Sequence, residues 1–169
     1  DCVARGIKGL VILSSGFSEV GAEGEALQRA VRDTALQGGA RVVGPNCLGL
    51  FSSDAGNFLT FSSSIEHGKP KVGHISIASQ SGAFGSHLFV LARQRGIGIA
   101  SWITTGNECD VDVADAIHFF AEDPDTHVIA AYAEGLKERD RLFAALEAAR
   151  KNRKPVVMMK VGRSEIGAE

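Results

Sequence analysis

The sequence predicts an α/β fold built on a largely parallel sheet, and three observations support this. From residue 73 onward, short apolar runs alternate with segments of helical spacing. The apolar runs are nearly continuous, which is typical of strands that are buried on both faces of a parallel sheet. Small polar turns rich in Ser, Gly and Asn follow these runs, at the sheet edge where parallel sheets usually bind ligands.

In this region we expect four strands and three helices in strict alternation. The expected strands are 73–79, 97–104, 127–133 and 155–160, and the expected helices are 82–95, 112–121 and 137–151. Right-handed crossovers between such strands give a doubly wound, flavodoxin-like sheet.

The first 45 residues show a separate β-α-β pattern, with strands 9–14 and 41–43 around a helix 23–37. We interpret residues 1–45 as the end of a preceding Rossmann-like domain and residues 46–169 as the flavodoxin-like domain. A short strand is expected at 48–51. Residues 52–70 are rich in Ser, Asn, Gly and Pro, and we expect a long ordered loop there. Because the chain starts with Asp1 and both ends fall inside expected elements, we expect it to be a piece of a longer polypeptide.

Composition limits the functional classes. The hydrophobic content of 44% and charged content of 22% are ordinary for a globular protein. No apolar run reaches membrane-spanning length, and we expect no membrane partner. A net charge of -2 gives no broad basic face, so nucleic acid is not an expected partner. Cys2, Cys47 and Cys109 are odd in number and lack metal-type spacing, which fits a reducing cytoplasm and no metal site.

The turn Ser79-Gln80-Ser81-Gly82 is the strongest candidate site, because it joins an expected strand to an expected helix. The first N–H groups of a helix have no partner inside it, and the helix dipole favours an anion there. Small residues also let a phosphate approach the backbone closely. The alternative is that Ser and Gly serve only helix capping and tight turn geometry. The sequence contains neither a phosphate-loop motif nor a Gly-x-Gly-x-x-Gly fingerprint.

Glu134 ends the apolar run 128–133. A carboxylate there is costly to bury without a partner. A histidine N–H is one such partner, because a carboxylate can fix the tautomer and free the other ring nitrogen as a nucleophile. The alternative is a solvated glutamate near the start of the next helix. Asp110 and Asp112 are expected to cap the helix at 112–121 rather than to bind a metal.

Four motifs in order carry a resemblance to a known family. They are Gly44-Pro45-Asn46-Cys47-Leu48-Gly49, Ser79-Gln80-Ser81-Gly82-Ala83-Phe84-Gly85, Gly106-Asn107-Glu108-Cys109-Asp110-Val111-Asp112 and Tyr132-Ala133-Glu134-Gly135. The chain resembles the NDP-forming acyl-CoA synthetases and, more distantly, the alpha subunit of succinyl-CoA synthetase. The tail 160–168 is also similar, so the resemblance covers essentially the whole chain and implies that the first 45 residues belong to a CoA-binding domain.

The resemblance implies a reaction. Acyl-CoA and phosphate give an acyl phosphate and free CoA, and the phosphoryl group then moves to a histidine and on to ADP, giving ATP. In reverse, the enzyme makes the thioester. The implied ligands are CoA, phosphate, a carboxylic acid, and ATP or ADP with Mg²⁺. The nucleotide is implied to bind an ATP-grasp domain or beta subunit, fused or separate, in a homo- or hetero-oligomer.

The resemblance also implies roles for residues. Glu134 would orient the histidine. The implied phosphate-binding residues are Ser79, Gln80, Ser81, Gly82, Gly106 and Asn107. The implied CoA-binding residues are Leu13, Ser14, Ser15 and Gly16, and Asn46, Cys47 and Ser86 would lie near the reacting groups. The phosphorylated histidine would follow the stretch matching 162–168, beyond Glu169. Ser86 stands where the succinyl-CoA synthetase alpha subunit has Tyr, which makes succinate an unfavoured substrate.

Two other functions stay open. Domains of this kind also occur fused to a protein acetyltransferase, as non-catalytic modules that sense CoA or another ligand; the downstream histidine would distinguish this case. A flavin-binding flavodoxin would share the fold. However, Trp102 and Tyr132 are the only partial candidates for stacking on a flavin, so we expect no flavin.

Overall fold

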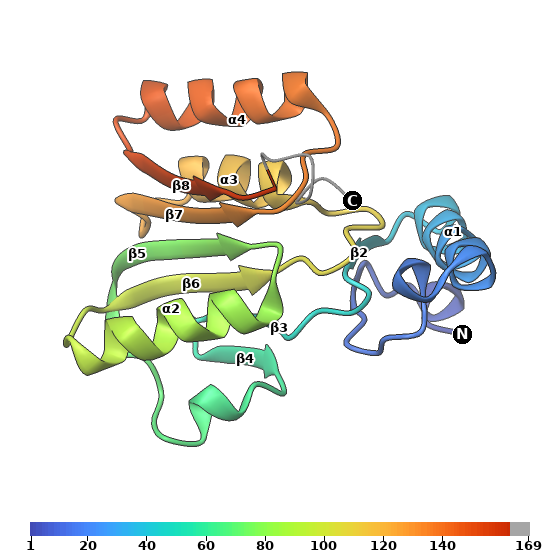
Figure 1. The fold of residues 1–169 in the computed structure, drawn as a ribbon, viewed down its shortest axis with the longest axis horizontal. Helices are drawn as coiled ribbons and strands as arrows, with labels where there is room; N and C mark the ends of the chain where they lie inside the picture. The colour runs from blue at the N-terminus through green and yellow to red at the C-terminus, as the bar shows by residue number, and fades with distance from the viewer. Residues whose placement is uncertain (163–169) are drawn as a thin grey trace.

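The computed structural model describes residues 1–162 and shows two lobes of unequal size (Figure 1). The strands are β1 (Gly9–Val11), β2 (Arg41–Val43), β3 (Gly49–Ser52), β4 (Asn57–Thr60), β5 (Val72–Ser79), β6 (Ile99–Thr104), β7 (Val128–Ala133) and β8 (Val156–Lys160). The helices are α1 (Ala22–Gln37), α2 (Gly82–Gln94), α3 (Val113–Glu122) and α4 (Arg139–Lys151), with 3₁₀ turns η1 (Val3–Arg5), η2 (Ser18–Val20) and η3 (Ser63–Ile65). Part of the tail matched by resemblance, 163–168, lies outside the described residues.

The larger lobe contains a six-stranded sheet in the order β4-β3-β6-β5-β7-β8. Strands β5 to β8 are parallel, and α2 packs on one face while α3 and α4 pack together on the other (Figure 1). This arrangement confirms the flavodoxin-like, doubly wound fold. The chain turns back after β6, so α2 and α3 must lie on opposite faces if every crossover is right-handed.

The prediction of a long loop over 52–70 was wrong in part, because β4 and η3 lie within it. Strands β3 and β4 form an antiparallel hairpin, and β3 also pairs antiparallel with β6, so the sheet is mixed. The hairpin is held by backbone pairing and by Phe58, whose ring stacks on Phe51 at 5.6 Å between centroids. Because β4 is only four residues long and is held by its partner strand, its sequence shows no alternation of apolar and polar residues that would predict it. The other predicted elements are present with shifted ends; the first strand is the most shortened.

Two apolar clusters fill the larger lobe. On one face, Trp102, Phe51 and Phe89 pack together beneath α2, and the indole N–H of Trp102 donates to Gly85 O at 2.9 Å. On the other face, α3 and α4 cover Ile129 and its neighbours. Trp102 lies in this core, since its exposure is 2%.

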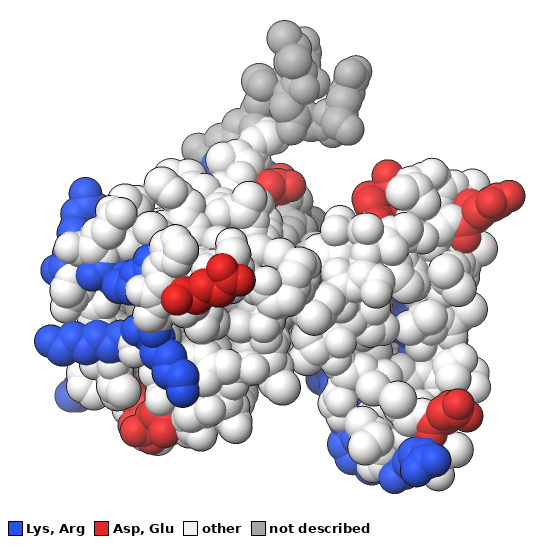
Figure 2. Space-filling model, turned by 90° about the horizontal axis from the view of Figure 1, so that it is seen from below, with Lys and Arg blue, Asp and Glu red and all other residues white. Residues whose placement is uncertain are grey.

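Polar and backbone contacts join the two lobes. Asp110 accepts hydrogen bonds from Arg41 Nε and Val42 N, both at 2.8 Å. Asp112 caps α3 in a capping box with Asp115, as predicted, whereas Asp110, also predicted to cap this helix, accepts hydrogen bonds from the smaller lobe instead. On the face drawn in Figure 2, most of the Lys and Arg side chains in view gather toward the outer end of the larger lobe on the left, and much of the surface between the lobes carries no charged side chain.

Two features are absent from residues 1–162. No helix in that range is long and apolar enough to cross a membrane. Nor does the range contain three or more His, Cys, Asp or Glu side chains grouped so that they could hold a metal ion. The cysteines of the same range are free thiols.

The core of α3 offers a matched pair of stability tests. Ile117 is fully buried, whereas Phe119, two residues later, is 66% exposed. Ile117→Ala should lower the free energy of unfolding by about 3 kcal/mol, because it removes buried methyl groups and leaves a cavity. Phe119→Ala should change it by no more than about 0.5 kcal/mol. Urea denaturation followed by circular dichroism measures both, and equal losses would contradict the packing described for this helix.

Candidate functional site

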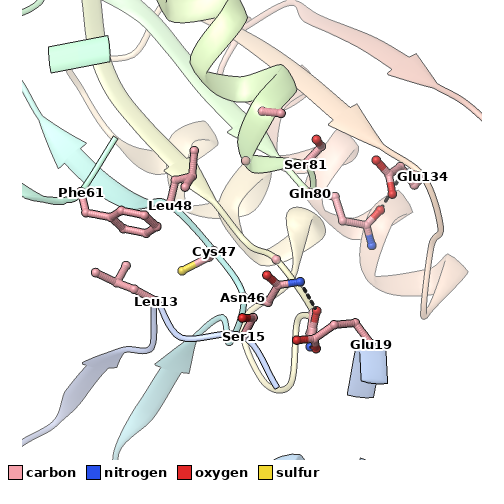
Figure 3. A pocket seen from close by; sticks show the side chains of 14 residues that line it. Leu13, Ser15, Glu19, Asn46, Cys47, Leu48, Phe61, Gln80, Ser81 and Glu134 are labelled. Carbon is pink, nitrogen blue, oxygen red and sulfur yellow. Dashed lines mark hydrogen bonds between the residues drawn. The ribbon is translucent and has the colours of Figure 1, made fainter. Parts of the chain in front are cut away.

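A cavity of about 620 Å³ opens between the lobes, at the carboxyl ends of β1, β2, β5, β6 and β7 (Figure 3). Most of the residues singled out in the sequence line it: Leu13, Ser15, Asn46, Cys47, Gln80, Ser81, Gly82, Gly106, Asn107 and Glu134. Glu19, Leu48, Phe61 and Ala83 complete the lining. The fold thus brings four separate motifs to one edge, as expected for an open parallel sheet.

Four of the singled-out residues do not line this cavity. Ser79 is fully buried, and its hydroxyl donates to Ser81 O at 2.6 Å, so it shapes the turn from inside. The backbone carbonyl of Ser14 accepts a hydrogen bond from the backbone N–H of Asn46 at 2.9 Å. Gly16 donates its N–H to Glu19, and Ser86 lies in an adjoining cavity.

The start of α2 faces the cavity. Ser81 is its N-cap, and the Ser81 hydroxyl accepts the N–H of Phe84 at 3.3 Å. The N–H groups of Gly82 and Ala83 belong to the first turn, where a helix offers no carbonyl partner. Both residues line the cavity, so uncompensated donors and the positive end of the helix dipole face the same space. An anion such as phosphate fits this position.

The Gln80 side chain bridges three turns. Its Oε1 accepts the backbone N–H groups of Glu134 at 2.7 Å and Gly135 at 2.9 Å. Its Nε2 donates to Glu108 Oε2 at 2.9 Å. All of these bonds are to protein groups, so the Gln80 amide holds the β7 turn against the β5 turn.

Glu108 is a buried carboxylate that the sequence did not single out, although it lies inside one of the four motifs. It is 3% exposed, and it accepts hydrogen bonds from Thr105 Oγ1 at 2.8 Å and Val113 N at 2.9 Å. Burial raises the pKa of Glu108, and the hydrogen bonds from Thr105 and Val113 and the nearby Lys137 ammonium act against that rise. The sequence could have indicated this role only through the apolar and small residues that follow in α3, which bury the turn.

Glu134 lies at the rim of the cavity, with an exposed side chain. The hydroxyl of Tyr132 donates to its Oε1 at 3.3 Å, and Lys160 Nζ donates to its backbone carbonyl at 2.7 Å. Among residues 1–162, no histidine lines this cavity. Figure 3 shows Glu134 on the same side of the cavity as Gln80 and Ser81.

The backbone N–H groups of Gly106 and Asn107 are directed to protein carbonyls, namely Gln80 O at 3.2 Å and Pro45 O at 2.9 Å. Gly106 has φ +59°, and a Cβ there would lie 2.3 Å from Pro45 O. Only glycine allows this approach of the β6 turn to the β2 turn. These two residues therefore position the cavity wall, and their N–H groups are not free for a ligand.

The Asn107 side chain joins the lobes at the cavity floor. Its Nδ2 donates to Glu19 and to Gln28 Oε1, the latter at 3.0 Å, and its Oδ1 accepts from Asn46 Nδ2 at 3.2 Å. Burial would raise the pKa of Glu19, but hydrogen bonds from Asn107 and from backbone N–H groups, including those of Gly16 and Phe17, lower it to about 2. Glu19 was missed in the sequence because it lies in η2, a 3₁₀ turn of three residues that is too short to show a pattern of its own.

The cavity has one apolar side. Leu13, Leu48 and Phe61 lie on the side away from Glu134 and Gln80, with Cys47 between them (Figure 3). Cys47 is 2% exposed, its thiol donates to Ile12 O at 3.4 Å, and burial raises its pKa. A thiol held in this way stays protonated near neutral pH, which makes Cys47 a wall residue rather than a nucleophile.

Residues 72–169 match the model of a family described as the succinyl-CoA ligase like flavodoxin domain. The chain belongs to this family. It is 36% identical over its whole length to acetate–CoA ligase [ADP-forming] I of Archaeoglobus fulgidus, of which it covers 24%. It is 38% identical over 98% of its length to the trans-feruloyl-CoA synthase of an unknown prokaryotic organism, of which it also covers 24%.

A solved structure is also similar to this succinyl-CoA ligase-like chain. It is the dinucleotide-forming acetyl-coenzyme A synthetase 1 of Ca. Korarchaeum cryptofilum, in complex with phosphate and ADP, with a TM-score of 0.87 and 37% identity. The match covers 99% of this chain and 35% of that one. The chain therefore spans about a quarter of the length of the two curated relatives and about a third of the solved one.

Removing the Gln80 bridge should loosen the β7 turn. In Gln80→Ala, the N–H groups of Glu134 and Gly135 lose their acceptor, so their hydrogen exchange should accelerate about tenfold. The free energy of unfolding should fall by about 2 kcal/mol, because Glu108 is left partly unsatisfied. Hydrogen–deuterium exchange with peptide mass spectrometry measures the first effect. Gln37→Ala, at the exposed end of α1, is the control and should leave the turn unchanged.

The lowered pKa of Glu19 predicts a pH-dependent contact between the lobes. Because the fold favours the ionised carboxylate, the contact should be fully present above the ordinary value of 4.5 and be lost as the pH falls toward 2. Carboxyl and side-chain amide NMR signals of Glu19 and Asn107 should titrate together near pH 2. A Glu19 midpoint near 4.5 would contradict the contact, and Glu19→Gln should remove the titration from the Asn107 signal.

Proposed function

We propose that the protein containing this chain is an NDP-forming acyl-CoA synthetase, which interconverts acyl-CoA, phosphate and ADP with a carboxylic acid, CoA and ATP. The observation that carries the proposal is the cavity itself. It combines a helix start suited to phosphate, an exposed carboxylate and the β1 turn in a chain whose relatives are named as CoA ligases and synthetases.

The first step would take place between the start of α2 and the β2 turn. A phosphate oxygen attacks the thioester carbonyl, the C–S bond breaks, and CoA leaves as the thiolate. The N–H groups of Gly82 and Ala83 would hold the phosphate and offset its charge. Asn46 and Cys47 lie on the opposite wall, so the acyl carbon would lie between them and α2.

The second step would be transfer of the phosphoryl group to a histidine outside the described residues. A ring nitrogen attacks phosphorus and the carboxylate leaves. Glu134 would accept the N–H of the other ring nitrogen, which fixes the tautomer and stabilises the developing positive charge. Its exposed position at the rim suits a partner that enters from outside, and Gln80 and Lys160 hold its backbone in place.

CoA would enter along the β1 turn. Leu13 and Ser15 line the cavity on the side of the smaller lobe, and Ser14 and Gly16 shape the same loop. The thiol end of CoA would lie beside Leu13 and Cys47. Its adenine end would contact residues outside this chain.

The remaining step, phosphoryl transfer from histidine to ADP, needs a nucleotide site. An ATP-grasp domain or beta subunit, fused or separate, would supply it, and the short coverage of both relatives leaves room for such a part. Mg²⁺ would accompany the nucleotide there. The names of the relatives also favour catalysis over the regulatory alternative.

Phosphorylation of the full-length protein tests the proposal. Incubation with ATP labelled at the γ-phosphate should give a protein-bound label that is labile in acid and stable in base, as expected of phosphohistidine. Glu134→Gln should reduce the rate of labelling at least tenfold, because the neutral amide no longer offsets the positive charge that develops on the histidine ring. Rapid-quench measurements with both proteins give the comparison.

Glu138→Gln is the matched control, because Glu138 is an exposed carboxylate four residues further along the chain. It should label at the normal rate. A folded, CoA-binding protein that takes up no label would contradict the proposed function and favour the regulatory module. Unchanged labelling of Glu134→Gln would remove Glu134 from the mechanism alone.

A further inference from the structure

The hydrogen bonds at the cavity floor have a fixed direction, which begins at Glu19. Glu19 Oε1 accepts the backbone N–H groups of Gly16 at 2.6 Å and Phe17 at 3.2 Å. Its other oxygen, Oε2, accepts from Asn107 Nδ2. The pKa of Glu19, about 2, keeps this carboxylate ionised near neutral pH, and an ionised carboxylate can only accept hydrogen bonds. The Asn107 amide must therefore turn its nitrogen toward Glu19.

The Asn107 amide passes this direction on to Asn46. Both hydrogens of Asn107 Nδ2 are used, one by Glu19 and the other by Gln28 Oε1 at 3.0 Å. Gln28 Oε1 also accepts the backbone N–H of Ser18 at 3.4 Å, which keeps the Gln28 oxygen on this side. The Asn107 oxygen is left for Asn46, and Asn46 Nδ2 donates to it at 3.2 Å. The carboxylate thus fixes two amides in one orientation.

Asn46 consequently presents an acceptor to the cavity that it lines. Figure 3 shows the hydrogen bond at the Asn46 side-chain nitrogen and the side-chain oxygen directed away from that bond. Within residues 1–162, no group donates to this oxygen, Asn46 Oδ1. The Asn46 backbone is also held, because its N–H donates to Ser14 O at 2.9 Å. This wall of the cavity therefore offers a hydrogen-bond acceptor whose position is set before any ligand binds.

Few groups in the proposed reaction can donate to such an acceptor. The thioester carbonyl and the departing thiolate only accept, and phosphate offers mainly acceptor oxygens. CoA, however, carries an amide N–H close to its sulfur, at the start of the thioethyl end of its pantetheine arm. Asn46 precedes Cys47, beside which the thiol end of CoA would lie, so this amide would reach the same wall.

We propose that Asn46 is a specificity-determining residue for CoA. Its side-chain oxygen accepts the N–H of the amide nearest the sulfur, and Glu19 is the positioning residue that holds this oxygen toward the cavity through Asn107. The same oxygen disfavours phosphate at this wall, because two acceptors repel each other, and leaves the anion to Gly82 and Ala83. This inference rests on the proposed synthetase function and adds the group by which the CoA arm is recognised.

A CoA analogue that lacks the donor tests the contact. In this analogue an ester oxygen replaces the N–H nearest the sulfur. For the full-length protein, the Kd of the analogue should exceed that of CoA about tenfold, because the Asn46 oxygen is covered without a donor. Asn46→Gly should bring the ratio of the two Kd values close to one. Glycine tolerates the φ of +57° at this position, so the turn is kept. Isothermal titration calorimetry measures both ligands.

Glu19→Gln tests the orientation. A glutamine can donate to Asn107, which lets the amides of Asn107 and Asn46 turn over and present an N–H to the cavity instead. The Kd ratio should therefore fall close to one, whereas a merely structural role of Glu19 would weaken both ligands equally. Glu23→Gln is the matched control and should keep the ratio, because Glu23 is an exposed carboxylate that does not line the cavity.

Failure of the proposed function and failure of this inference give different results. If the full-length protein binds no CoA and takes up no phosphoryl label, the proposed function fails, and the inference fails with it. If CoA binds but the analogue binds equally well, or if Asn46→Gly keeps the preference for CoA, the inference fails alone. A preference that Asn46→Gly removes but Glu19→Gln keeps in full would overturn the positioning role of Glu19.

Discussion

The cavity depends on one side-chain amide. Gln80 accepts two backbone N–H groups of the β7 turn and donates to the buried carboxylate of the β6 turn. Only a primary amide supplies both functions at that length. A glutamate in its place would set a second carboxylate against Glu108, and a leucine would leave three polar groups unpaired. Because Gln80 directly precedes the cap of α2, the same residue fixes the helix start relative to Glu134.

The bridge from Gln80 ends on Glu108, a buried carboxylate that needs several hydrogen-bond donors. A buried carboxylate is tolerated only where hydrogen bonds satisfy it, and here Thr105, Val113 and Gln80 do so. The Lys137 ammonium donates to the backbone carbonyl of Glu108 and adds a favourable charge. The Glu108 carboxylate accepts from Val113 at the start of α3 and from Gln80 beside the start of α2, so it links the β6 turn to both helices. Loss of any one of these hydrogen bonds would loosen the edge of the cavity.

The sequence was sufficient to predict the parallel strands, because their apolar runs are continuous and their ends carry small polar residues. It was also sufficient to bring Asn46, Ser81 and Glu134 to one edge, since that follows from parallel order alone. It could not show that Gln80 bonds protein groups, because an amide suits a phosphate equally well and the register of Ser79 with Tyr132 is invisible in the chain. Strand β4 was not predicted for a related reason. Its pairing with β3 makes it a strand, and its own sequence shows no strand pattern. The division at residue 45 stays a prediction.

The junction of the lobes indicates when the cavity forms. Cys109 packs into the apolar cluster of the smaller lobe with Ala35 and Val42, and its N–H donates to Gly44 O at 2.9 Å. Val111 pairs with Val43 as a parallel bridge, so a segment of the larger lobe extends the two-stranded sheet of the smaller one. The two lobes are therefore joined by apolar packing and backbone pairing as well as by polar side chains. The walls of the cavity are therefore set by folding itself. In the proposed reaction, donors fixed in this way would act on a developing charge without first having to reorganise.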